Sequence, residues 1–128
     1  MTQRLAAVTL LVDDYDAAIA YYVAVLGFEL LEDTALGPDK RFVRVAPAGG
    51  GCALLLARAA DAEQRARIGG QTGGRVFLFL HTDDFDRDHA AYSSRGVEFL
   101  GPPRDEAYGR VVVLRDGYGN LWDLVQPS

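Results

Sequence analysis

Two stretches of the chain repeat one short pattern 70 residues apart, and this repeat constrains the fold more than any other feature. An apolar run ends in Val12-Asp13-Asp14-Tyr15-Asp16, and a second one ends in Thr82-Asp83-Asp84-Phe85-Asp86. Each stretch opens a helix-like run that ends at a glycine, which an apolar-Glu-apolar triplet follows in Gly27-Phe28-Glu29-Leu30 and Gly96-Val97-Glu98-Phe99. The repeat predicts two copies of one unit, with a ligand site where the copies meet.

Apolar periodicity extends the repeat to the whole chain. In the first copy it predicts strands over 5–12, 28–32, 41–45 and 52–58 and helices over 15–26 and 60–68. In the second copy it predicts strands over 76–82, 97–100, 110–115 and 121–126, a helix over 85–95, and a polar loop through Pro102-Pro103. Each copy reads βαβββ, which predicts an α+β fold. We expect a single domain with module one at 1–68, a linker at 69–74 and module two at 75–128.

Three motifs carry a resemblance to a known family, and this resemblance covers nearly the whole chain. They are Val8-x-Leu10-x-Val12-x-Asp14, Ala18-Ile19-x-Tyr21-Tyr22 through Leu26-Gly27-Phe28, and Asp116-x-x-Gly119-Asn120-Leu121-Trp122-Asp123-Leu124-Val125-Gln126. The chain resembles the vicinal oxygen chelate superfamily, which includes glyoxalase I, extradiol dioxygenases, fosfomycin-resistance enzymes and bleomycin-resistance proteins. The resemblance implies two βαβββ modules that form a curved mixed sheet around a cup for small ligands, commonly in a homodimer.

Metal-dependent members of this superfamily take ligands from the first and fourth strand of each module. A divalent metal needs three or four His or carboxylate ligands there. The repeat places these positions at Ala7, Leu55, Phe77 and Asp123, and only the last of them carries a donor. We therefore expect no cofactor and no divalent metal, provided that the alignment of the two copies is correct.

The predicted cup has an apolar, aromatic wall on the second module, formed by Phe77, Phe79, Leu121 and Val125. Small residues share the equivalent face of the first module, which favours an asymmetric pocket, although the aromatic side chains would alternatively fill the cup as a core. The residues that we expect to contact a ligand are Thr9, Leu55, Phe77, Phe79, His81, Tyr108, Leu121 and Asp123.

Asp123 is the candidate catalytic residue, as an orienting acceptor or general base whose pKa apolar neighbours raise. A cation such as Arg44 or Arg110 would lower that pKa instead. The alternative is a half-exposed carboxylate that is hydrogen-bonded to a neighbour. His81 is either a rim histidine or a ligand contact, and Tyr108 lies at a loop tip, with a ligand role, a dimer role or neither.

Two further side chains have simpler predicted roles. His89 is expected on the surface of the second helix, and Trp122 is expected in the core beneath the helices.

Composition narrows the function further. The chain carries 13 Lys and Arg against 18 Asp and Glu, a net charge of −5 without a basic cluster, which argues against nucleic acid and anionic membranes. No apolar run suits a membrane span or a secretory signal, and Cys52 is the single cysteine, so we expect a cytoplasmic protein.

The leading function is metal-free binding of an aromatic or amphipathic small molecule. The alternatives are a glyoxalase-like lyase or dioxygenase-type enzyme, metal-free through Asp123 or metal-dependent if the alignment is wrong, and an interaction domain whose cup is filled.

Overall fold

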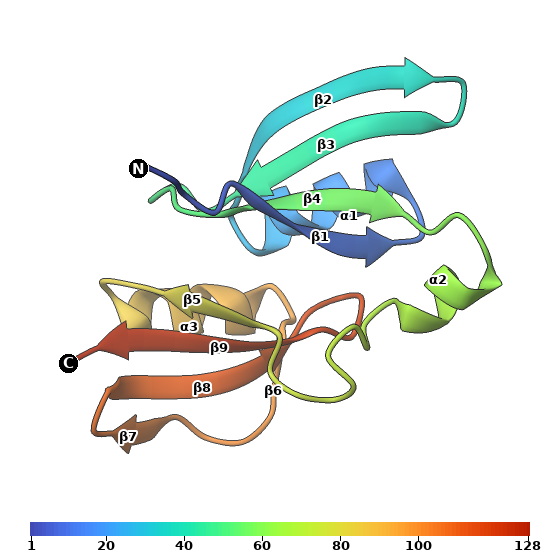
Figure 1. Cartoon of the computed structure of the whole chain (residues 1–128). Coiled ribbons are helices and arrows are strands. Elements are labelled where there is room, and N and C mark those ends of the chain that lie inside the picture. The colour runs from blue at the N-terminus through green and yellow to red at the C-terminus, as the bar shows by residue number, and fades with distance from the viewer. The chain divides into compact units, whose positions relative to one another are not determined.

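The computed structural model describes all residues from Met1 to Ser128, which form two compact units (Figure 1). The first unit spans Met1–Ile68 and the second spans Gly69–Ser128. Each unit has its own mixed sheet. The expectation that both modules act as a single domain stays a prediction.

The first unit follows the predicted order of one strand, one helix and three strands. Its strands are β1 (Ala7–Val12), β2 (Glu29–Gly37), β3 (Lys40–Ala46) and β4 (Ala53–Arg58), and its helices are α1 (Tyr15–Ala20), the π-helical turn η1 (Tyr21–Val25) and α2 (Ala62–Arg67). The sheet order is β1-β4-β3-β2, with a parallel β1–β4 pair and antiparallel neighbours elsewhere. The predicted strand over 5–12 was too long at its start, because β1 begins at Ala7. The predicted strand over 28–32 was too short, because β2 continues to Gly37.

The second unit repeats this arrangement. Its elements are β5 (Leu78–His81), α3 (Phe85–Ser94), β6 (Glu98–Phe99), β7 (Arg104–Glu106), β8 (Gly109–Arg115) and β9 (Leu121–Pro127). The sheet order β5-β9-β8-β6 matches β1-β4-β3-β2 strand for strand, including the parallel first pair. The predicted α+β fold of two βαβββ modules is confirmed.

The polar segment after β6 was predicted as a loop, and this was wrong. Its β7 pairs antiparallel with β8, so that Arg104 lies opposite Val111 and Glu106 lies opposite Gly109. Two short strands, β6 and β7, thus take the place that the continuous β2 occupies in the first unit. The interruption falls at Pro102-Pro103, because proline has no N–H to donate to a sheet ladder.

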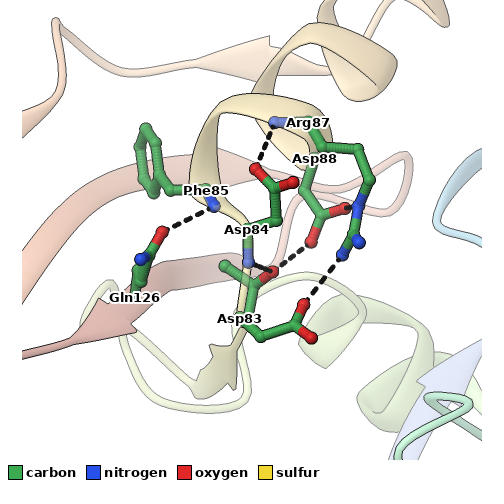
Figure 2. A network of polar contacts seen from close by, with 7 residues as sticks. Asp83, Asp84, Phe85, Arg87, Asp88 and Gln126 are labelled. Atoms are coloured by element: carbon green, nitrogen blue, oxygen red, sulfur yellow. Dashed lines mark hydrogen bonds and ion pairs between the residues drawn. The ribbon is translucent and has the colours of Figure 1, made fainter.

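The repeated Asp pair begins the helices. Asp14 accepts a hydrogen bond from the backbone N–H of Ala17 at 2.8 Å, and Asp84 accepts one from that of Arg87 at 3.1 Å. Such N-caps satisfy backbone donors that the first helical turn leaves unpaired. Figure 2 shows the second cap together with Gln126 of β9, whose side-chain oxygen accepts from the backbone N–H of Phe85 at 2.8 Å.

The first helix differs at its end from the prediction of a regular helix over 15–26. Its last turn is π-helical, and Phe28 donates its backbone N–H to the carbonyl of Tyr22 at 2.9 Å. Gly27 follows with a positive φ of 77°, which suits a residue without a side chain after a helix. Tyr22, within this turn, is fully buried.

Each sheet packs one face against its helix, α1 in the first unit and α3 in the second (Figure 1). The buried apolar residues include Leu10, Val12, Tyr22, Val43, Val45 and Leu56 in the first unit, and Phe85, Tyr92, Val112, Leu114, Trp122 and Leu124 in the second. Because side chains alternate along a strand, the intervening residues lie on the opposite face of each sheet.

Trp122 lies in the core as predicted, and its indole N–H donates to Oδ2 of Asp116 at 2.9 Å. Asp116 also accepts from the backbone N–H groups of Tyr118 and Asn120, so that one buried carboxylate closes the turn before β9. No helix in the structure has the length and apolar character needed to span a membrane.

Candidate ligand-binding site

The face of the second sheet opposite α3 carries most of the predicted ligand-binding residues. Phe79 of β5 lies directly opposite Asp123 of β9, and Asp123 in turn lies opposite Val113 of β8. Two residues further along the strands, His81 lies opposite Val125. Two residues before Phe79, Phe77 donates its backbone N–H to the carbonyl of Leu121 at 2.8 Å. Registered partners project to the same side of a sheet, so these side chains share one surface.

This surface combines an exposed ring with a buried carboxyl group. The side chain of Phe79 is 64% exposed, whereas Asp123 beside it is only 8% exposed. Phe77 and Leu121 are half-buried, and Val125 is buried. An exposed phenylalanine on an ordered strand is apolar area that a partner molecule can cover.

Asp123 is in an unusual electrostatic position. Its Oδ1 atom is buried and has no hydrogen-bond partner within the chain. Burial raises the pKa of this carboxyl group, and the charge of Arg104 opposes the shift. Asp123 is therefore buried and not half-exposed as the alternative had it, and the pKa shift has the direction predicted for apolar neighbours.

The sequence did not identify Arg104 as the cation whose charge acts on Asp123. Arg44 pairs with Glu32 of its own sheet at 3.3 Å, and Arg110 lies on the α3 side with its guanidinium 5.1 Å from the Phe85 ring centre. Arg104 belongs to β7, which the sequence presented as a loop, and it pairs with Glu106 at 3.3 Å.

The remaining predicted residues of the second unit lie at its edges. His81 is exposed at the end of β5. Tyr108 is 55% exposed in the tight turn between β7 and β8, where its carbonyl accepts from the backbone N–H of Ser128, and its ligand or dimer role stays a prediction. His89 was expected on the surface. It is instead half-buried and stacks on Phe85 and Phe99, with ring centres 5.6 Å and 4.4 Å away.

Thr9 and Leu55, the predicted contacts of the first unit, are direct neighbours across the β1–β4 pair. Thr9 is exposed and Leu55 is half-buried. Leu55 also borders a cavity of about 720 Å³, whose lining comes from the β2–β3 turn, the end of β4 and α2. The sequence did not predict this cavity, because its walls are far apart along the chain.

The positions at which the resemblance implies metal ligands do not fit a divalent ion. Ala7 and Leu55 in the first unit and Phe77 in the second offer hydrocarbon only, which leaves the carboxylate of Asp123. Neither unit brings together three His, Cys, Asp or Glu side chains in an arrangement that would hold a metal. A single carboxylate is too small a donor set for stable coordination.

The chain is similar in sequence and in fold to several known proteins. The family model of the Glyoxalase/Bleomycin resistance protein/Dioxygenase superfamily matches residues 4–124. A protein of Shewanella frigidimarina (strain NCIMB 400), described as uncharacterized, is 52% identical over 98% of this chain and 95% of its own length.

Two solved structures show the same fold at substantial sequence identity. A superfamily member from Sphaerobacter thermophilus DSM 20745 is 31% identical, with a TM-score of 0.81 over 98% of both chains. TnmS3, an antibiotic binding protein from Streptomyces sp. CB03234, is 32% identical, with a TM-score of 0.78 over 100% of this chain and 98% of its own.

Proposed function

Because the chain belongs to the Glyoxalase/Bleomycin resistance protein/Dioxygenase superfamily, as its motifs indicated, we propose that it binds a small aromatic molecule. The proposed ligand carries an N–H or O–H group and lies on the face of the second sheet that holds Phe79 and Asp123. The antibiotic-binding description of TnmS3 supports a small-molecule ligand for this scaffold.

The observation that carries the proposal is the pair formed by Phe79 and Asp123. A buried acceptor without a partner costs about 1–3 kcal/mol, so a ligand that donates a hydrogen bond to Oδ1 of Asp123 would recover part of that cost. The neighbouring ring of Phe79 offers an apolar face for offset or edge-to-face packing against an aromatic ligand. Phe79 would thus supply apolar contact area, and Asp123 would fix the orientation of the ligand, as polar groups do in most small-molecule sites.

We propose that binding proceeds without a metal ion. The hydrocarbon side chains of Ala7, Leu55 and Phe77 support this, because they offer no ligand atom at the positions where metal-dependent relatives coordinate.

A fluorescence titration with N-phenyl-1-naphthylamine, a neutral aromatic amine with one N–H donor, tests the proposed function. Phe79→Ala should weaken binding about ten-fold, while Phe79→Tyr, which keeps the ring, should stay close to the parent protein. Asp123→Leu removes the acceptor at similar volume and should weaken binding several-fold. Equal affinity of the parent protein, Phe79→Ala and Asp123→Leu for this amine would refute the proposed site.

A second candidate function is proton transfer by Asp123, which the raised pKa of its carboxyl group favours. A general base on this surface would speed exchange of the acidic C–H protons of an aromatic ketone such as phenylacetone in D2O. Faster exchange with the parent protein than with Asp123→Asn, followed by proton NMR, would support catalysis. Identical exchange rates would leave binding alone.

A further inference from the structure

We propose that the cavity of the first unit is a second binding site, for an amphipathic anion with an apolar body and a sulfonate, carboxylate or phosphate group. It shares no residue with the surface around Phe79 and Asp123, and it lies within the unit Met1–Ile68. The inference therefore stands independently of the proposed function.

The cavity has the size and the wall composition of a small-molecule site. Its volume of about 720 Å³ lies within the range of roughly 300–1,000 Å³ that is typical of ligand pockets. Phe42, Leu55 and Ala57 line it from β3 and β4, and Leu36, an exposed side chain of β2, adds to the apolar wall. An apolar body of one or two fused rings fits such a space.

Four cations line this cavity, and three of them, from three different elements, are unpaired. Lys40 comes from β3, Arg58 from the end of β4 and Arg65 from α2, and none of them forms an ion pair within the chain. Asp39 is the one carboxylate in the lining. In a chain with a net charge of −5, the convergence of unpaired cations on one hollow indicates complementarity to an anion.

Arg41, the fourth cation in the lining, differs from the other three because it is already paired with carboxylates. Its guanidinium binds Asp33 at 2.6 Å and Asp16 at 2.8 Å and lies 5.1 Å from the ring centre of Tyr15. These contacts tie the start of β3 to α1, so Arg41 forms a fixed wall, and its charge is already neutralised.

Hydrogen bonds at the start of α2 hold the opposite wall in place. Asp61 accepts from the backbone N–H of Gln64 at 2.8 Å, and the Gln64 side chain accepts from the backbone N–H of Ala60 at 2.8 Å. This pair of bonds resembles a capping box, except that Gln64 accepts from the residue before the N-cap, and it fixes the loop at Ala60 and the start of the helix that carries Arg65. A site that is ordered before binding loses less entropy when the ligand arrives.

The helix also provides a matched control. Arg65 and Arg67 both lie in the last turn of α2, where cations favour the helix dipole, but only Arg65 lines the cavity. If the charges serve the helix alone, replacing either arginine should have the same effect on an anionic ligand. If the charges serve the cavity, only Arg65→Gln should weaken the binding of an anionic ligand.

Two fluorescent probes that differ by a single charged group test the proposal on the full chain. They are 8-anilinonaphthalene-1-sulfonate and its neutral analogue N-phenyl-1-naphthylamine. Arg65→Gln and Lys40→Gln should each weaken the binding of the sulfonate about three-fold, because each removes one exposed charge contact. The double variant Arg58→Gln/Arg65→Gln removes two such contacts and should weaken the binding about ten-fold. The same variants should leave the affinity for the neutral probe unchanged, as should Arg67→Gln for both probes.

Salt and the second-unit variant complete the test. Raising the ionic strength from about 20 to about 200 mM should lower the affinity for the sulfonate and leave the affinity for the neutral probe unchanged. Phe79→Ala should reduce the binding of the neutral amine, whereas the double variant should reduce only the binding of the sulfonate, so failure of one proposal is distinguishable from failure of the other. Unchanged sulfonate affinity in both the double variant and Lys40→Gln, or an equal loss with Arg67→Gln, would overturn the cavity as an anion site.

Discussion

Phe79 and Asp123 lie directly opposite each other in the parallel β5–β9 pair, yet the ring is 64% exposed and the carboxyl group beside it is 8% exposed. An exposed apolar side chain and a buried acidic one reverse the usual preference of these residue types. The reversal occurs on the sheet face that no helix of the second unit covers, and it distinguishes this surface from the α3 side.

The carboxyl group of Asp123 should make stability depend on pH. Because burial raises its pKa above the ordinary value of 3.8, the protonated form is favoured in the folded chain. Its stabilising contribution is therefore complete below pH 3.8 and is lost as the pH rises through the folded-state pKa.

Asp123→Asn cannot titrate and serves as the reference. Urea unfolding of both proteins between about pH 3 and about pH 7 should show the parent protein losing stability relative to Asp123→Asn as the pH rises. A difference in the free energy of unfolding that stays constant over this range would show that the carboxyl group is not desolvated.

Two phenylalanines separate surface from core. Phe79→Ala should change the free energy of unfolding by about 0.5 kcal/mol or less, because its ring is largely exposed. Phe85→Ala should cost about 3–5 kcal/mol, because Phe85, the first residue of α3, is 2% exposed and belongs to the core. Urea unfolding measures both, and a loss above about 2 kcal/mol for Phe79→Ala would identify its ring as core.

The turn before β9 depends on one buried carboxylate. Asp116→Ala leaves the indole N–H of Trp122 and the side-chain amide of Asn120 without their acceptor, and should cost about 3 kcal/mol or more. Asp116→Asn keeps one acceptor oxygen and should lose less. The fluorescence of Trp122, the single tryptophan, reports unfolding directly. Equal stability of Asp116→Ala and the parent protein would contradict a structural role for this network.

The sequence predicted the topology because its signals are local. Each Asp cap and each terminal glycine marks an element boundary within a few residues, and the repeat supplies the correspondence between the two units. The pairing of Phe79 with Asp123 also follows from strand alternation, once β5 and β9 are aligned as first and fourth strands.

The features that the sequence concealed depend on contacts between distant segments. The charged strand β7 shows no apolar alternation, since all three of its residues are exposed, so Arg104 was not available as a neighbour of Asp123. Lys40, Arg58 and Arg65 lie in three separate elements, and only the folded unit brings them to one cavity. The stacking of His89 likewise depends on Phe99, which belongs to another element.

Amide NMR would detect the binding of an aromatic donor beside Phe79 and Asp123 at the residues concerned. Nitrogen-15-labelled full-length chain is titrated with N-phenyl-1-naphthylamine, and shifts of the backbone amide signals are followed residue by residue. We expect the largest shifts at Phe79, Val113 and Asp123, which share one row of the second sheet. Saturable shifts confined to α3 or to other residues outside this row, with these three amides unmoved, would contradict the proposed site.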